Sequence, residues 1–214
     1  MKHKIEKNTV QETLILPLYS RKLCTELYPN LYQDETAVRL IDEIDYDFSE
    51  AEKNSRSLMQ RFGALEVAMR QNDLAWEVRD YLKTHPSAAV VFASEVFYYF
   101  LTQQVKALVR GMADAFPGGV LVFDAANRTA VKMIAKTWLR TAKIKDVGAY
   151  FAVSDAPKEI GEWDNRLQVT SRGYMLGYND LRDPSVSGFF RFLARVGDNG
   201  MKMQIVKIGF GGKA

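Results

Sequence analysis

Two carboxylates stand directly after apolar segments that have the character of buried strands. Glu95 follows the apolar run 88–93, and Asp124 follows the run 120–123. In a layered α/β sheet, a strand covered on both faces is continuously apolar, and ligands bind beyond the carboxyl ends of such strands. Arg70 lies in a long helical pattern, and its planar guanidinium can hold a carboxylate with two parallel hydrogen bonds. The two carboxylates predict a binding site at the strand ends without identifying its ligand.

Each of these residues also has a purely structural interpretation. Arg70 would then be a solvated arginine on a helix, and Asp124 would be the N-cap of the segment that follows it. Tyr98 and Tyr99 would either line a substrate pocket or pack in the core. The residue types alone leave both interpretations open.

The elements expected around these residues divide the chain into two parts of one domain. Helical spacing predicts helices at 14–27, interrupted by Pro17, at 35–44 after an N-cap at Asp34, and at 57–83. Further along, we predict strands at 88–93, 120–123, 149–153, 167–170, 174–178 and 203–208, and helices at 102–116, 129–141, 156–163 and 189–196. This alternation predicts a mostly parallel α/β sheet in 85–214, preceded by a helical part in 1–84.

Composition restricts the compartment and the partners. The 214 residues are 47% hydrophobic, and 29 basic residues nearly balance 26 acidic ones, which gives no electrostatic case for nucleic acid or a membrane surface. A basic group is interpreted as a solvated face; it consists of Lys132, Lys136, Arg140, Lys143 and Lys145. Cys24 is the only cysteine, so no internal disulfide forms and a reducing cytoplasm is expected. The sequence contains neither a signal-peptide pattern nor an apolar run of the ~20 residues that a membrane helix needs.

Several kinds of catalytic site are excluded by the scarcity of their residues. His3 and His85 are the only histidines, so with one cysteine the usual zinc ligands cannot assemble. The chain has no Gly-x-Ser-x-Gly elbow for a nucleophilic serine. The glycines at 209–212 precede no helix and therefore form no phosphate loop.

Five stretches of the sequence resemble, in order, one enzyme family. They are 12–21 (ETLILPLYSR); Asp34, Ala37 and Val38 with 44–47; 68–70 with the helix end 83–86; 94–100 with 104–108; and 116–124. The resemblance is to the S-adenosylmethionine-dependent O-methyltransferases of the leucine carboxyl and polyketide-biosynthesis type. Each stretch is unspecific alone, and it is their order along nearly the whole chain that carries the resemblance.

This resemblance implies a fold, a cofactor and a reaction. The fold is a class I methyltransferase (Rossmann-like) sheet, and the reaction transfers a methyl group from S-adenosylmethionine to a carboxylate or hydroxyl of a small molecule. The implied cofactor residues are Arg21, Arg70 and Glu95. Of these, Arg70 is the one that would pair with the cofactor carboxylate. Tyr19 and Tyr99 are the implied substrate residues, and no catalytic residue is assigned.

One part of the family pattern is absent. A methyltransferase of this class has a glycine-containing turn after its first strand, but no glycine occurs between Gly63 and Gly111. The family also has Glu-Gly where this chain has Glu95-Val96. We interpret this as the loss of about two strand–helix units of ~30 residues each, with the junction near Val91-Phe92. The alternative function is then a catalytically inactive remnant or interaction module, which self-associates through the surface that the loss exposes.

Overall fold

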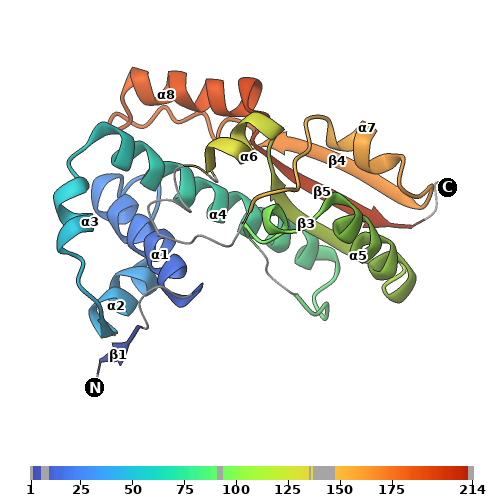
Figure 1. Ribbon diagram of the computed structural model, residues 1–214, viewed down its shortest axis with the longest axis horizontal. Helices are drawn as coiled ribbons and strands as arrows, with labels where there is room; N and C mark the ends of the chain where they lie inside the picture. Colours follow the sequence, from blue (N-terminus) through green and yellow to red (C-terminus); the bar gives the residue numbers. More distant parts are fainter. Residues whose placement is uncertain (1, 6–9, 91–93, 135, 137–147, 212–214) are drawn as a thin grey trace.

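The structure is a computed structural model that describes residues 2–5, 10–90, 94–134, 136 and 148–211. Helices from the first half of the chain gather at one end of the molecule, and a three-stranded sheet forms the other end (Figure 1). The long helix α4 (Leu58–Thr84) runs from the first end towards the sheet, and α8 (Gly188–Arg195) lies along the top of the same view. The molecule is therefore an α/β structure in which α4 connects the helical part to the sheet.

The helical part follows the sequence prediction closely. It comprises α1 (Val10–Leu27), α2 (Glu35–Glu43), α3 (Ser49–Asn54) and α4, with a parallel pair of two-residue strands, β1 (His3–Lys4) and β2 (Ile44–Asp45). Asp34 is the N-cap of α2, as predicted, and accepts a hydrogen bond from the Ala37 amide; Ser57 caps α4 in the same way.

The predicted interruption of the first helix at Pro17 is wrong. Pro17 lies inside α1, which continues to Leu27. A proline inside a helix loses one backbone hydrogen bond and clashes with the preceding turn. Helix α1 packs against both α4 and α2, and we attribute the continuity of the helix to this packing.

The main sheet corrects the prediction of mostly parallel pairing. Its strands are β3 (Val120–Ala125), β4 (Leu167–Gly173) and β5 (Gln204–Phe210), in the order β3-β5-β4, and β5 is antiparallel to both neighbours. Val206 of β5 stands opposite Phe123 on one side and Ser171 on the other. The last strand runs opposite to both neighbours and lies in the middle, where it is buried along most of its length. Strands β3 and β4 still run in the same direction, so their carboxyl ends share one edge.

Two other predicted strands are not strands in the structure, and neither is the described part of a third. Residues 148–153 form no ladder, although Phe151 and Val153 are buried; the Val153 amide donates instead to the Ala126 carbonyl. Residues 174–178 form turns. The described part of the third, 88–90, is irregular and mostly exposed, and 91–93 lie outside the described residues together with the expected junction at Val91-Phe92. An apolar run reflects burial, and burial does not require a strand.

The helices of the second half are largely as predicted. They are α5 (Thr102–Ala115), α6 (Arg128–Ile134), α7 (Ala156–Gly161) and α8, with a 3₁₀ turn at η1 (Phe97–Tyr99) and a π turn at η3 (Val196–Gly200). The later part of the predicted helix 129–141 falls on residues outside the description, as do Arg140, Lys143 and Lys145 of the basic group. Within the described ranges, no helix combines the length and the apolarity needed to span a bilayer.

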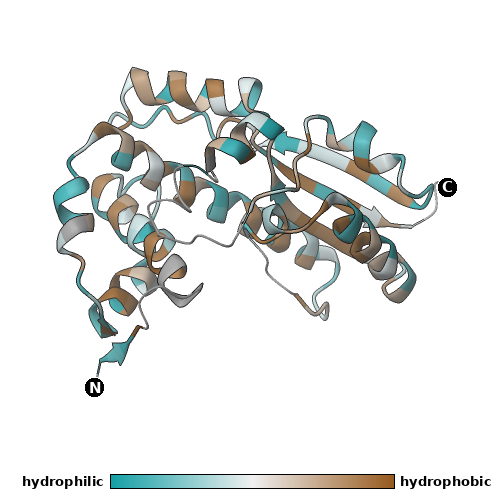
Figure 2. Cartoon of the chain, viewed as in Figure 1, coloured by the Kyte–Doolittle hydropathy of each residue, from teal (hydrophilic) through white to brown (hydrophobic). Residues whose placement is uncertain are grey.

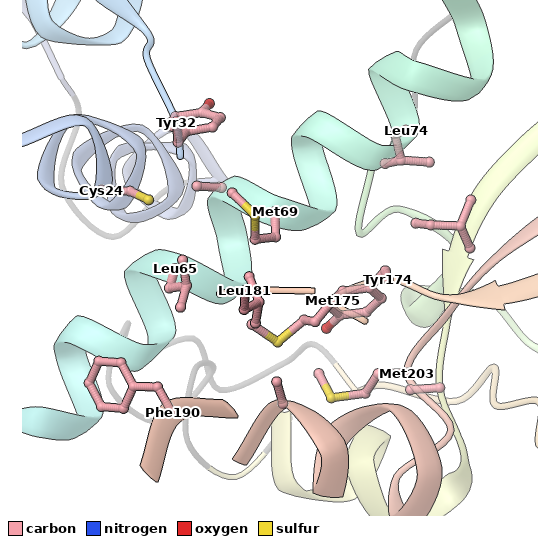
Figure 3. Packing of buried hydrophobic residues seen from close by; sticks show 14 of the residues in the cluster. Cys24, Tyr32, Leu65, Met69, Leu74, Tyr174, Met175, Leu181, Phe190 and Met203 are labelled. Carbon is pink, nitrogen blue, oxygen red and sulfur yellow. The ribbon is translucent and has the colours of Figure 1, made fainter. Parts of the chain in front are cut away.

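Two large apolar clusters hold the elements together. The first joins α1, α4, α8 and β5, and Figure 3 shows α4 passing between α1 and α8 with Leu65 and Met69 directed into this core. The second cluster lies between the sheet, α5 and α7, where hydrophobic segments of α5 and the strands lie together in Figure 2. Helix α4 therefore presents one apolar face to the first core, and any polar residue on that face must find a partner.

Candidate functional site

Arg70 and Glu95 form an ion pair beside the carboxyl end of β3. Arg70 is on α4 and only 4% exposed, and its Nη1 lies 2.6 Å from Oε1 of Glu95, whose side chain is one-third exposed. The backbone amide of Glu95 donates to Oδ1 of Asp124 in β3 at 2.8 Å. Three residues that are far apart in the sequence thus meet at one point. We call them, with the neighbouring Tyr98 and Tyr174, the Arg70 cluster.

Two polar atoms of this cluster lack a partner in the described part of the chain. They are Nε of Arg70, a charged donor, and Oδ2 of Asp124, an acceptor, and both are buried. A buried polar atom without a hydrogen bond costs roughly 1–3 kcal/mol, and more when the group is charged. The cluster therefore offers a ligand the Nε donor of Arg70 and the Oδ2 acceptor of Asp124, although the Tyr98 hydroxyl approaches the Asp124 carboxylate closely enough for that carboxylate to add to the effect of burial in raising the Tyr98 pKa.

Aromatic rings enclose the cluster. Tyr98 and Tyr174 are both buried, and the ring centre of Tyr174 lies 5.9 Å from the guanidinium carbon of Arg70, a cation–π distance. The Tyr174 hydroxyl donates to Oε1 of Glu66 at 2.8 Å. Burial raises the pKa of both tyrosines well above its ordinary value. Both hydroxyls therefore stay neutral at physiological pH.

The cluster and its immediate neighbours contain more carboxylates than cations. Burial raises the pKa of Glu95; the charge of Arg70 opposes this shift, and the charge of Asp124 adds to it. Burial also raises the pKa of Glu66. For Arg70, burial acts to lower the pKa, but Glu95 and Asp124 hold it well above its usual range. Arg70 is the one cation among three carboxylates, so a second positive charge would stabilise the cluster.

Glu95 has an unusual backbone conformation. Its φ is +60°, in the left-handed region that residues with a side chain occupy at a cost of roughly 1–2 kcal/mol. The ion pair of its side chain with Arg70 and the hydrogen bond from its backbone amide to Asp124 hold it in this conformation. The strain falls on Glu95, next to the position where the family resemblance would place a glycine. Strain of this kind accumulates at sites where the surrounding contacts impose it.

Of the remaining predicted site residues, Tyr99 lies near the Arg70 cluster, whereas Arg21 and Tyr19 have their partners in the helical part of the chain. Tyr99 is 44% exposed and close enough to Glu95 for that charge to act on it, so it belongs to the neighbourhood of the cluster. Arg21 donates to Asp34 through Nε at 2.8 Å and Nη2 at 2.5 Å, and no contact between described residues joins it to Arg70. Tyr19 is buried and stacks on Phe48 in a separate small cluster.

Two further buried carboxylates on α4 escaped the sequence prediction. Asp73 is fully buried; its Oδ1 accepts a hydrogen bond from Asn179 at 3.1 Å, and its Oδ2 has no partner among the described residues. Glu77 accepts from the Tyr178 hydroxyl at 2.8 Å and pairs with Lys207 at 2.9 Å. Both follow Arg70 at intervals of three and seven, on the face that packs inward. Polar residues at helical spacing on an apolar face are the signal that could have identified them.

No group of three histidine, cysteine, aspartate or glutamate side chains in the described part of the chain is arranged to hold a metal ion. Comparison of the chain with protein-family models, with curated protein sequences and with solved structures gives no match. The functional interpretation therefore rests on the residues and their geometry.

Proposed function

We propose that this chain is an S-adenosylmethionine-dependent O-methyltransferase by descent, and that the Arg70 cluster binds the amino-acid end of the cofactor. The reaction class is methyl transfer to a carboxylate or hydroxyl of a small molecule. The observation that carries the proposal is the pair of unpartnered buried atoms, Arg70 Nε and Asp124 Oδ2.

The chemical complement of these two atoms is an α-amino acid. A ligand carboxylate would accept from the guanidinium of Arg70, and a ligand ammonium would donate to Asp124. The ammonium would also supply the positive charge that the three carboxylates around Arg70 favour. The methionine part of S-adenosylmethionine carries both groups on one carbon, so the residues present fit that end of the cofactor.

The position of the cluster in the sheet supports the same proposal. Asp124 is the second-last residue of β3, and β3 and β4 end at the same edge. The cluster therefore lies on the side of the sheet where both strands end, although each of them pairs antiparallel with β5.

Methyl transfer needs alignment more than it needs a reactive side chain. When bound, the cofactor supplies an activated methyl group on a sulfonium, and the protein contributes positioning and the exclusion of water. Tyr99, half-exposed beside Glu95, is the residue suited to meet the methyl acceptor. Burial, followed by the charge of Glu95, raises the pKa of Tyr99, so its neutral hydroxyl can donate a hydrogen bond to an acceptor carboxylate.

The missing glycine turn sets the expected affinity. The residues directly before Glu95 that the structure describes, 85–90 and 94, are mostly exposed, and none of them is a glycine that would let the backbone approach the rest of the cofactor. Binding then depends on the amino-acid end, and we expect a dissociation constant of roughly 0.1–1 mM, which corresponds to about 4–5.5 kcal/mol.

This proposal is tested by equilibrium dialysis with labelled S-adenosylmethionine. Asp124→Asn keeps the oxygen that accepts the Glu95 amide and removes the negative charge, and we expect it to weaken binding about tenfold. Asp80→Asn is the matched control, because Asp80 is an exposed aspartate of the same helix that pairs with Lys83 and lies outside the Arg70 cluster. Equal affinity of the two variants would contradict the assignment.

A second candidate, self-association of an inactive remnant, is favoured by a separate observation. The segment that leads from the expected junction into α5 exposes large hydrophobic side chains; they are Val90, Val96, Tyr99, Phe100, Leu101 and Leu108. Strand β3 pairs with β5 on one side only, among the described strands, which leaves an edge beside this segment. This candidate predicts a dimer by light scattering that Leu101→Asp converts to a monomer, and a monomeric parent chain would exclude it.

A further inference from the structure

A surface pocket of about 680 Å³ lies between α8 and the turns that follow β4. Its lining consists of Leu176, Asn179, Asp180, Arg182, Arg191 and Arg195. None of these residues belongs to the Arg70 cluster or to the residues predicted from the family resemblance. The pocket therefore needs an explanation of its own.

The charge of the lining is strongly one-sided. Three arginines face one carboxylate, so the charged side chains sum to +3 − 1 = +2. Arg191 and Arg195 are one turn apart on α8, where like charges repel by roughly 0.2–0.5 kcal/mol. The single ion pair in the lining, between Nε of Arg182 and Oδ2 of Asp180 at 3.4 Å, is exposed and hence weak. An anion in the pocket would relieve this repulsion.

Two of the arginines differ in how they are held. Nη1 of Arg191 donates to the Val186 carbonyl at 2.7 Å, which fixes the guanidinium against the turn before α8 and leaves its other donors for a ligand. Arg195 is exposed and makes no hydrogen bond or ion pair with the described part of the chain. One arginine is thus preorganised and the other is available to close on a ligand, an arrangement that lowers the ordering cost of binding.

We propose that this pocket binds a small organic anion through a phosphate or carboxylate group. A guanidinium can donate two parallel hydrogen bonds to two oxygens of either group. Asn179, also in the lining, can donate to a further oxygen through the second hydrogen of its amide nitrogen, since that nitrogen already donates to Asp73. The proposal does not depend on methyl transfer, because it concerns other residues and another ligand chemistry.

The test is calorimetric titration of the full chain with inorganic phosphate and, separately, with citrate, at low ionic strength. Arg195→Gln is the main variant, since the exposed Arg195 side chain makes no hydrogen bond or ion pair with the described residues that the substitution would break. Arg39→Gln, an exposed arginine on α2, is the matched control. We expect Arg195→Gln to weaken binding of at least one of the two anions by about tenfold and Arg39→Gln to leave it unchanged.

Phosphate and citrate, together with single-stranded RNA and vesicles of anionic lipid, distinguish the chemical classes of anion that the pocket could bind. Tighter binding of phosphate assigns the site to a phosphate ester, and tighter binding of citrate assigns it to a carboxylate. Equal affinities of both variants for both anions would overturn the proposal. It would also be overturned if single-stranded RNA or vesicles of anionic lipid bound in an Arg195-dependent way while neither small anion did. As a control for folding, both variants should have the same midpoint temperature of thermal unfolding as the parent chain.

Discussion

Replacing Arg70 with methionine is expected to lower the free energy of unfolding by about 3 kcal/mol. Methionine fills a similar volume but leaves Glu95 and Asp124 beside each other without a cation. Removing one partner of a buried ion pair usually costs roughly 3–5 kcal/mol. We expect the low end of that range, because the Glu95 side chain is one-third exposed and water screens part of its charge. Urea denaturation at pH 7 measures the change.

A matched substitution and a double variant separate the ion pair from packing. Arg79→Met changes an exposed arginine of the same helix and should cost little. The double variant Arg70→Met/Glu95→Gln should be more stable than Arg70→Met alone, since one of the two carboxylate charges left without a cation is then gone. If Arg70→Met were no more destabilising than Arg79→Met, the Arg70–Glu95 ion pair would not contribute to the stability of the fold, which would contradict the expected result.

Asp73→Asn is expected to remove a large part of the dependence of stability on pH. Burial raises the pKa of Asp73 from 3.8 to about 8; the hydrogen bond from Asn179 opposes this shift, and the charge of Asp198 adds to it. Between these values the folded protein holds a proton that the unfolded chain has released. The stability of the parent chain therefore falls as pH rises from about 4 to 8, by up to roughly 1.4 kcal/mol per pH unit. Asparagine keeps the acceptor for Asn179 and does not ionise.

The measurement is denaturation at several pH values between 4 and 8. Asp73→Asn should match the parent near pH 4, where Asp73 holds a proton in the folded state and largely in the unfolded chain, and exceed it increasingly towards pH 8. Glu66, Glu95 and Asp198 also have raised pKa values and stay in the variant, so a smaller slope of the same sign should remain. Asp80→Asn should leave the parent's slope unchanged. A parent whose stability is constant or rises from pH 5 to 8 would contradict a protonated Asp73.

The helices could be predicted from the sequence because their signals are local. Asp34 and Ser57 accept hydrogen bonds from amides only three residues away, so the starts of α2 and α4 are encoded in a few neighbouring residues. The continuation of α1 through Pro17 could not be predicted, since it depends on packing against α4.

The strands were harder to predict because pairing is not local. The run 120–123 is half-buried over its first three residues and became β3, whereas Phe151 and Val153 are fully buried without belonging to a ladder. Which apolar run pairs depends on where the last segment, β5, inserts, and its antiparallel direction was not visible in the alternation of strands and helices. A mostly parallel sheet was therefore the wrong expectation.

The candidate site was predicted in part. The meeting of Arg70 and Glu95 was expected from the resemblance, and Asp124 was expected at a strand end; their direct contacts come from the structure. Arg21 was expected in the same neighbourhood, but Asp34 holds it within the helical part. The pairing of Asp73 with Asn179 depends on a turn region 106 positions away, which no local pattern could indicate.

The central claim is that the Arg70 cluster recognises an α-amino acid on S-adenosylmethionine. The most direct measurement is calorimetric titration of the parent chain with S-adenosylmethionine and, in parallel, with 5′-methylthioadenosine, which carries the same nucleoside and lacks the amino-acid end. Our account predicts saturable binding of S-adenosylmethionine near 0.1–1 mM and binding of methylthioadenosine at least about tenfold weaker. Equal affinity for the two compounds, or no binding of S-adenosylmethionine at millimolar concentration, would contradict it.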